Sequence, residues 1–146
     1  MEKRHTLPIS VQLLLEKEDK ILLMKRKNTG YEDGKYCLPG GHVEAHEEIR
    51  KALIREAKEE IGIDIDMQDI KFYKVMNRKV NSNQEYIDFI FKANHWTGEI
   101  TNEENNKCEE IIWANKKNLP ENILSFIPEI LKNDKVMYLP YNWDEN

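Results

Sequence analysis

The stretch of sequence that decides the fold runs from residue 41 to residue 63 and reads GHVEAHEEIRKALIREAKEEIGI. Plotted at about 100° per residue, its apolar side chains share one arc: Leu53, Ile54, Ala57 and Ile61. This pattern predicts an amphipathic helix that packs one side against a core. The helix is expected to begin at Glu47 and to stop at Gly62, because glycine readily adopts the left-handed conformation of a C-cap.

Glutamates occupy a neighbouring side of this helix. Glu59 and Glu60 lie three and four residues after Glu56, and like charges at those spacings cost about 0.2–0.5 kcal/mol per pair. Arg55 can reach Glu59 one turn later, but one cation does not neutralise three anions. An acidic helix face is often simply solvated. The alternative is a bound cation, and carboxylate oxygens suit Mg²⁺, Mn²⁺ or Ca²⁺ better than zinc or copper.

The spacing of the fixed residues in this stretch resembles the Nudix box, here at 41–63. The matching positions are Gly41, Glu47, Arg55, Glu56, Glu59, Glu60, Gly62 and Ile63. The resemblance implies a single Nudix hydrolase domain over residues 1–146. The implied fold is the α/β/α Nudix sandwich, a mixed β-sheet flanked by the box helix and a C-terminal helix. The family often has glycine before the first box glutamate and a small polar residue after it, whereas this chain has His46 and Glu48.

Composition limits the class of protein and the partners it can have. The chain has 146 residues, 40% of them apolar and 34% charged, with a net charge of −5. This length is enough for one domain with a core, and the charge argues against coating nucleic acid. No apolar run reaches the roughly 18–20 residues of a membrane span, and residues 1–8 lack the apolar segment of a signal peptide. A cytoplasmic protein with Cys37 and Cys108 reduced is therefore expected.

The rest of the chain alternates strand patterns with polar turns. Strands are expected at 9–15, 21–24, 36–38, 70–76, 86–93 and 107–113. The first is expected to be half-buried, and the polar residues 77–84 are expected to connect a hairpin. Residues 122–131 have the spacing of an amphipathic C-terminal helix. The aromatic tail, residues 136–143, is expected to pack on its own domain, to form a dimer surface or to edge a base pocket, in that order.

Three positions near the box are candidates for phosphate contact. Arg26 lies in a basic triplet, residues 25–27, that follows the second expected strand and is either a solvated strand end or, as the resemblance implies, a substrate contact. Gly40 and Gly41 let the backbone approach a ligand closely, although a plain turn would also explain them. His42 follows directly and is either a lone exposed histidine or a donor to phosphate. The family resemblance implies that the Gly40 carbonyl helps to hold the metal.

Carboxylates supply the remaining candidate functions. The resemblance implies Mg²⁺ or Mn²⁺ held by the backbone of one residue and the side chains of four others: Gly40, Glu56, Glu59, Glu60 and Glu104. Glu104 lies in an acidic loop, residues 102–106, that is either solvated or reaches the metal site, with Glu103 as the second choice. The catalytic candidates are Glu56, Glu59, Arg55 and Glu104. Glu56 or Glu104 would be the general base, and Arg55 would position a box glutamate by an ion pair.

The resemblance implies hydrolysis of a nucleoside diphosphate linked to a group X. A nucleoside triphosphate, modified or not, cleaved to a monophosphate and pyrophosphate is the first hypothesis. It is favoured by the small size and by a Lys-Cys-Glu … Trp … Leu-Pro pattern from Lys107 to Pro120, in which Asn105 replaces the family's proline. Alternatives are a nucleotide sugar, ADP-ribose or a dinucleoside polyphosphate, or a non-catalytic nucleotide sensor. A small nucleotide is the expected partner, with a homodimer as a further expectation.

Overall fold

The centre of the fold is β1 (Ile9–Lys17), the strand on which an eight-stranded mixed sheet is built. The computed structural model describes residues 2–143. The other elements follow along the chain: β2 (Lys20–Arg26), β3 (Tyr36–Cys37), β4 (Gly40–His42), α1 (Ile49–Ile61), the 3₁₀ turn η1 (Met67–Asp69), β5 (Lys71–Asn81), β6 (Gln84–Ala93), β7 (Cys108–Asn115), α2 (Phe126–Leu131) and β8 (Tyr138–Tyr141).

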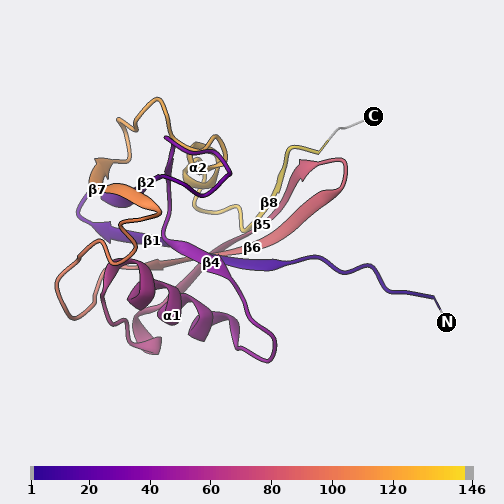
Figure 1. The fold of residues 1–146 in the computed structure, drawn as a ribbon, viewed down its shortest axis with the longest axis horizontal. Helices are drawn as coiled ribbons and strands as arrows, with labels where there is room; N and C mark the ends of the chain where they lie inside the picture. The colour runs from indigo at the N-terminus through magenta and orange to yellow at the C-terminus, as the bar shows by residue number, and fades with distance from the viewer. Residues whose placement is uncertain (1, 144–146) are drawn as a thin grey trace.

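The strand order places β1 between the two halves of the sheet. The main path is β3-β2-β1-β6-β5-β8, with β4 added to β1 and β7 added to β2. β1 runs parallel to β6 and antiparallel to β2 and β4. Helices α1 and α2 lie on opposite sides of the sheet (Figure 1). The predicted mixed sheet between a central and a C-terminal helix is therefore confirmed.

Both faces of β1 are buried, so the prediction of a half-buried strand was wrong. Val11, Leu13 and Leu15 belong to the core beneath α1, whereas Leu14 belongs to the core beneath α2. All four side chains are fully buried. A strand covered by helices on both sides needs apolar residues on both faces. The pair Leu13–Leu14, where strict alternation breaks, was the signal for this arrangement.

The connection between β5 and β6 is much shorter than predicted. Residues 77–84 were expected to be a polar linker, but β5 continues to Asn81 and β6 begins at Gln84. Polar residues remain in these strands because they pair across the hairpin: Arg78 lies opposite Tyr86 and forms an ion pair with Asp88. The extension matters because it brings Arg78 next to the glycine turn.

The C-terminal region differs from its prediction in the start of the helix. α2 begins at Phe126, not at residue 122, because the preceding backbone is bonded to β3. The amide of Tyr36 donates to the Asn122 carbonyl at 2.8 Å, and the Leu124 amide donates to the Tyr36 carbonyl at 3.0 Å. The aromatic tail packs on its own chain, as β8 parallel to β5. No helix within residues 2–143 is long and apolar enough to cross a membrane.

Candidate active site

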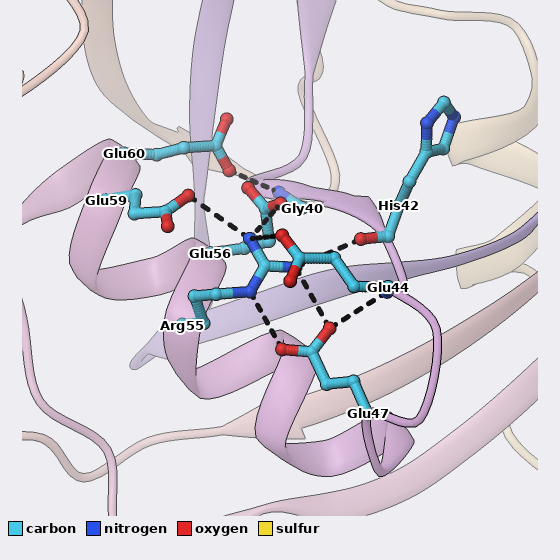
Figure 2. Close-up of polar contacts among 8 residues, drawn as sticks. All are labelled: Gly40, His42, Glu44, Glu47, Arg55, Glu56, Glu59 and Glu60. Atoms are coloured by element: carbon cyan, nitrogen blue, oxygen red, sulfur yellow. Dashed lines mark hydrogen bonds and ion pairs between the residues drawn. The ribbon is translucent and has the colours of Figure 1, made fainter.

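Helix α1 fixes the direction of the box carboxylates. Its buried side consists of four residues: Ala52, Leu53, Ala57 and Ile61. Ile54, predicted to share that side, is only half-buried, and Ala52 takes its place in the core. Gly62 ends the helix with φ 74°, as predicted for a C-cap. The packed side leaves Glu56, Glu59 and Glu60 along the side that faces the glycine turn of β4 (Figure 2).

The helix begins at Ile49, two residues later than predicted. Glu47 lies in the preceding turn, where its carboxylate accepts a hydrogen bond from the Glu44 amide at 3.0 Å. The same carboxylate is bonded to Arg55 at 2.8 and 3.1 Å. Glu47 therefore serves as an anchor for Arg55, and the helix-dipole explanation for an acid in the first turn does not apply to it.

His46, at the position where the family often has glycine, has a left-handed backbone with φ 63°. Non-glycine residues in this conformation cost about 1–2 kcal/mol. We expect His46→Gly to raise the free energy of unfolding by about 1 kcal/mol, since glycine's extra freedom in the unfolded chain offsets part of the gain. Urea unfolding measures the change. Ala45→Gly, at a neighbour without positive φ, is the control and should destabilise.

Arg55 is the centre of the ion-pair network (Figure 2). Its Nη1 donates to the carboxylates of Glu56 at 2.9 Å and Glu59 at 3.2 Å. Its Nε and Nη2 hold Glu47, and Nη2 also donates to the His42 carbonyl at 3.1 Å. One guanidinium thus connects the turn before the helix, the glycine strand and two of the three box carboxylates. The ion pair expected between Arg55 and the box glutamates is present.

The two glycines of β4 lie directly against these carboxylates. The Gly40 amide donates to Glu60 Oε1 at 2.7 Å. A Cβ on Gly40 would lie 2.0 Å from the Val11 carbonyl oxygen of the neighbouring strand, so the β1–β4 pairing requires glycine there. A Cβ on Gly41 would lie 2.4 Å from Glu56 Oε1. The turn therefore lets the backbone approach two acids closely.

Gly41→Ala provides a test of the Glu56 position. The clash is with the end of a flexible side chain, so the fold should survive with a melting temperature close to that of the wild type. The carboxylate must move, however, and misplacing a catalytic group costs rate. We expect kcat for nucleotide hydrolysis to fall about tenfold or more. Steady-state kinetics beside a thermal melt checks this, and unchanged turnover would contradict it.

Two acids of this site, Glu56 and Glu60, have raised pKa values. Burial raises the pKa of Glu60 well above its usual 4.5, the Gly40 amide opposes that shift, and the charges of Glu56 and Glu104 add to it. Burial also raises the pKa of Glu56, while Arg55 lowers it and the charges of Glu59 and Glu104 raise it. Like charges thus repel within a partly dry site, which favours proton uptake or a bound cation.

The acidic loop presents Glu104 and turns Glu103 away. Glu104 lines the same cavity as Glu60, a space of about 420 Å³ between β4 and the loop. The Glu103 carboxylate instead accepts a hydrogen bond from Thr101 at 2.6 Å and lies against Gly62. The Glu103 amide donates to the Glu60 carbonyl at 3.1 Å, but of the two loop residues it is Glu104 that lines the cavity with Glu60.

The donor set fits a hard divalent cation in an open site. Among the described residues, the one hydrogen bond to the Glu60 carboxylate comes from Gly40, and Glu56 and Glu104 repel it. Within residues 2–143, no three His, Cys, Asp or Glu side chains are already arranged to enclose a metal ion. Mg²⁺ does not need such a cage, because it keeps several waters and binds through one or two carboxylates plus substrate phosphates.

Arg26 and His42 line the cavity beside these acids. Arg26 Nε donates to the Tyr31 carbonyl at 2.8 Å and Nη2 to the Thr29 hydroxyl at 3.1 Å, so its guanidinium holds the loop after β2. His42 is exposed and stacks on Tyr86, with ring centroids 5.7 Å apart. Both residues, with Gly40 and Gly41, also border a second cavity.

This second cavity, of about 500 Å³, is the part of the site that the sequence prediction missed. Its walls include Gln12, Tyr31, Arg78, Tyr86 and Phe126. Arg78 and Tyr86 were assigned to a linker and to a strand without function. Residues 77–86 have no alternating apolar pattern, so the local sequence contained no signal that the two strands extend through them.

Comparison with known proteins identifies the family. A model of the NUDIX domain matches residues 6–133, so the chain belongs to the Nudix family, as the box spacing predicted. The crystal structure of MutT NUDIX hydrolase from Burkholderia pseudomallei superposes with a TM-score of 0.79 at 24% identity. The superposition covers 88% of this chain and 98% of that one. The fold is therefore MutT-like.

Curated relatives resemble this chain over different lengths. The chain is 47% identical over 55 residues to the ADP-ribose pyrophosphatase of Methanocaldococcus jannaschii, covering 38% of this chain and 32% of that protein. It is 26% identical over 104 residues to the 8-oxo-dGTP diphosphatase of Proteus vulgaris, covering 69% of this chain and 88% of that one. It spans 32%, 56% and 37% of the length of three curated relatives that it matches.

Proposed function

We propose that this protein is a nucleoside triphosphate pyrophosphatase that uses Mg²⁺ or Mn²⁺ and releases a nucleoside monophosphate and pyrophosphate. The observation that carries the proposal is the half-buried Glu60 carboxylate. It lines the acidic cavity near two like-charged neighbours and accepts a hydrogen bond from Gly40, which borders both cavities. One cavity has acids for metal-bound phosphates, and the other has aromatic walls suited to a nucleoside.

The residues around these cavities have distinct proposed roles. Glu56, Glu59, Glu60 and Glu104, with the Gly40 carbonyl, would hold the cation. Bound Mg²⁺ would neutralise charge on the phosphate oxygens and orient an in-line attack. Arg26, His42 and the Gly41 backbone would contact phosphate, since all three border both cavities.

A carboxylate with a raised pKa is suited to accept the proton of the attacking water. Glu56 has such a pKa through burial and neighbouring charge, and it lies against Gly41 at the cavity wall. Glu104 is the second candidate, because it enters the same cavity from the loop. Arg55, which bonds to both Glu56 and Glu59, is a positioning residue that fixes where these acids point.

Hydrolysis of a substrate panel tests the proposal. Nucleoside triphosphates, including 8-oxo-dGTP, would be incubated beside ADP-ribose, nucleotide sugars and dinucleoside polyphosphates, with Mg²⁺ or with a chelator. We expect triphosphates to yield a monophosphate and pyrophosphate in equal amounts when Mg²⁺ is present, and no product when the chelator is present. Products from ADP-ribose or sugar nucleotides alone would replace the proposal by its alternative, for which the 47% identity over 55 residues is the supporting observation. Binding without any hydrolysis would indicate a nucleotide sensor.

The remaining expectations concern the partners and the location of the protein. A small nucleotide is the proposed partner, rather than a nucleic acid or a membrane, because the net charge is −5 and the candidate cavities are small and partly acidic. A homodimer in the cytoplasm is proposed. Exposed apolar residues at β8, such as Met137 and Tyr138, offer a surface for such a dimer.

A further inference from the structure

A row of stacked planar groups runs along the second cavity. His42 stacks on Tyr86, and the Arg78 guanidinium carbon lies 4.5 Å from the Tyr86 ring centroid. The same carbon lies 5.1 Å from the Phe126 ring, which meets Tyr141 edge-on at 5.9 Å. The row joins the glycine turn to α2 and to the C-terminal strand. Arg78 is its middle member and keeps N–H groups that Asp88 does not accept.

Arg78 is held in a fixed orientation by a fully buried acid. Its Nε donates to Asp88 Oδ2 at 2.8 Å, and its Nη2 donates to Oδ1 at 3.0 Å. Asp88 is also bonded to the Ser10 hydroxyl and, at 3.2 Å, to the Gln12 amide. Every one of these contacts restricts rotation of the carboxylate. The Arg78 guanidinium is therefore pre-organised before any ligand enters.

The occupied contacts leave a defined set of free donors on Arg78. A guanidinium has five N–H groups, and Asp88 takes one from Nε and one from Nη2. No acceptor among residues 2–143 meets the other three. The Tyr86 and Phe126 rings pack against the guanidinium, so the in-plane N–H groups are its means of recognising a ligand. Two parallel N–H groups, one on each Nη atom, remain for that recognition.

We propose that Arg78 selects the base of the substrate, with Asp88 as the residue that positions it. Two parallel donors match two adjacent acceptors in the plane of a base. Guanine presents such a pair at O6 and N7, and cytosine presents one at O2 and N3. Adenine and uracil have a donor beside each acceptor on the corresponding edges. The inference rests on the proposed function in that it takes the ligand to be a nucleotide.

Position within the site supports this assignment. The cavity with Arg78 shares Gly40, Gly41 and His42 with the acidic cavity, so one nucleotide could place its phosphates at the acids and its base at Arg78. Tyr31, exposed on the loop after β2, borders the same cavity and offers a ring for stacking.

Binding of products tests the inference without relying on turnover. Titration calorimetry with GMP, CMP, AMP, UMP and pyrophosphate, each with Mg²⁺, would compare the wild type with two variants. Arg78→Lys keeps the positive charge but loses the two parallel N–H donors. The double variant Arg78→Gln with Asp88→Asn leaves no buried carboxylate unpaired. It therefore provides a folded variant if Arg78→Lys fails to fold. Lys71→Gln, an exposed residue on the same strand, is the control for loss of charge.

We expect GMP or CMP to bind the wild type most tightly, and both Arg78 variants to lose about 10- to 100-fold of that affinity. AMP, UMP and pyrophosphate should change little, so that discrimination between bases disappears. Equal weakening of all nucleotides, or unchanged preference in a folded variant, would overturn the inference and leave the proposed function intact. If the wild type binds one base selectively, the variants lose that selectivity and the protein hydrolyses no substrate, the inference would be supported and the proposed function overturned.

Discussion

Glu60→Gln is expected to lower kcat for Mg²⁺-dependent nucleotide hydrolysis by about 10²–10³-fold while leaving the fold intact. The half-buried Glu60 carboxylate accepts a hydrogen bond from the Gly40 amide, and a glutamine can keep one polar contact there but not the charge. Loss of that charge removes the group that would hold the cation at the phosphates. A Glu60→Gln protein with undiminished Mg²⁺-dependent turnover would refute the assignment.

The same substitution should stabilise the metal-free protein at high pH. Burial and the charges of Glu56 and Glu104 raise the Glu60 pKa in the folded state above its value in the unfolded chain. Below the unfolded pKa both states are protonated and no penalty exists. As the pH rises through the folded pKa, the folded state must ionise a buried acid, and stability is lost. We therefore expect the variant to melt above the wild type at pH 8, with the difference vanishing near pH 4.

Adding Mg²⁺ should reverse this order. A cation that binds only the folded state stabilises it in proportion to RT ln(1 + [L]/Kd), and the wild type should gain more than the variant. Glu103→Gln is the matched control, because that carboxylate belongs to the same acidic region but bonds to Thr101. Its turnover should stay within about twofold of the wild type, as for a surface change away from the site. Thermal melts with chelator and with Mg²⁺ measure these differences.

The box helix could be predicted from sequence because its information is local. The apolar arc, Gly62 and the spacing of the three acids all lie within about four turns of helix. Helical periodicity alone then determines which side of the helix each side chain occupies. The reason for the glycines before the helix is not local, since a Cβ on Gly40 would meet Val11 of β1 and a Cβ on Gly41 would meet Glu56 of α1. The expectation that Gly40 and Gly41 lie beside the box acids therefore came from the family resemblance and not from a local pattern.

The nucleoside side of the site depends on pairings that are distant in sequence. Arg78 meets Asp88 only because β5 and β6 continue to a tight turn, and Phe126 reaches Arg78 from α2, which packs on the same face of the sheet. Register and layer packing determine such contacts, and no short window contains them. The start of α2 was mispredicted for a similar reason. The backbone of residues 122–124 forms a β-bridge with Tyr36, and its hydrogen bonds are then not available for a helix.

Arg55→Lys is expected to lower both stability and turnover, because no other side chain can make the same set of contacts. The Arg55 guanidinium bonds to Glu47, Glu56, Glu59 and the His42 carbonyl at 2.8–3.2 Å. Lysine keeps the charge but has a single nitrogen and no planar fork. We expect the free energy of unfolding to fall by about 2 kcal/mol, a value reduced for the partial exposure of the side chain. Loss of the Glu56 and Glu59 positions should lower kcat about 100-fold.

A control on the same helix separates this role from a general loss of arginine. Arg50 pairs with Glu48 at 2.9 Å, and both side chains are about half exposed, so Arg50→Lys should change stability by less than about 0.5 kcal/mol. The effect at Arg55 should also depend on pH. Arg55 holds the Glu47 pKa below its usual range, so this pair stabilises the fold above the unfolded pKa and is lost as the pH falls through the folded pKa. Urea unfolding should therefore show a larger gap between wild type and Arg55→Lys at pH 7 than at pH 3. Equal effects of Arg50→Lys and Arg55→Lys on stability and kcat would show that Arg55 does not organise the site.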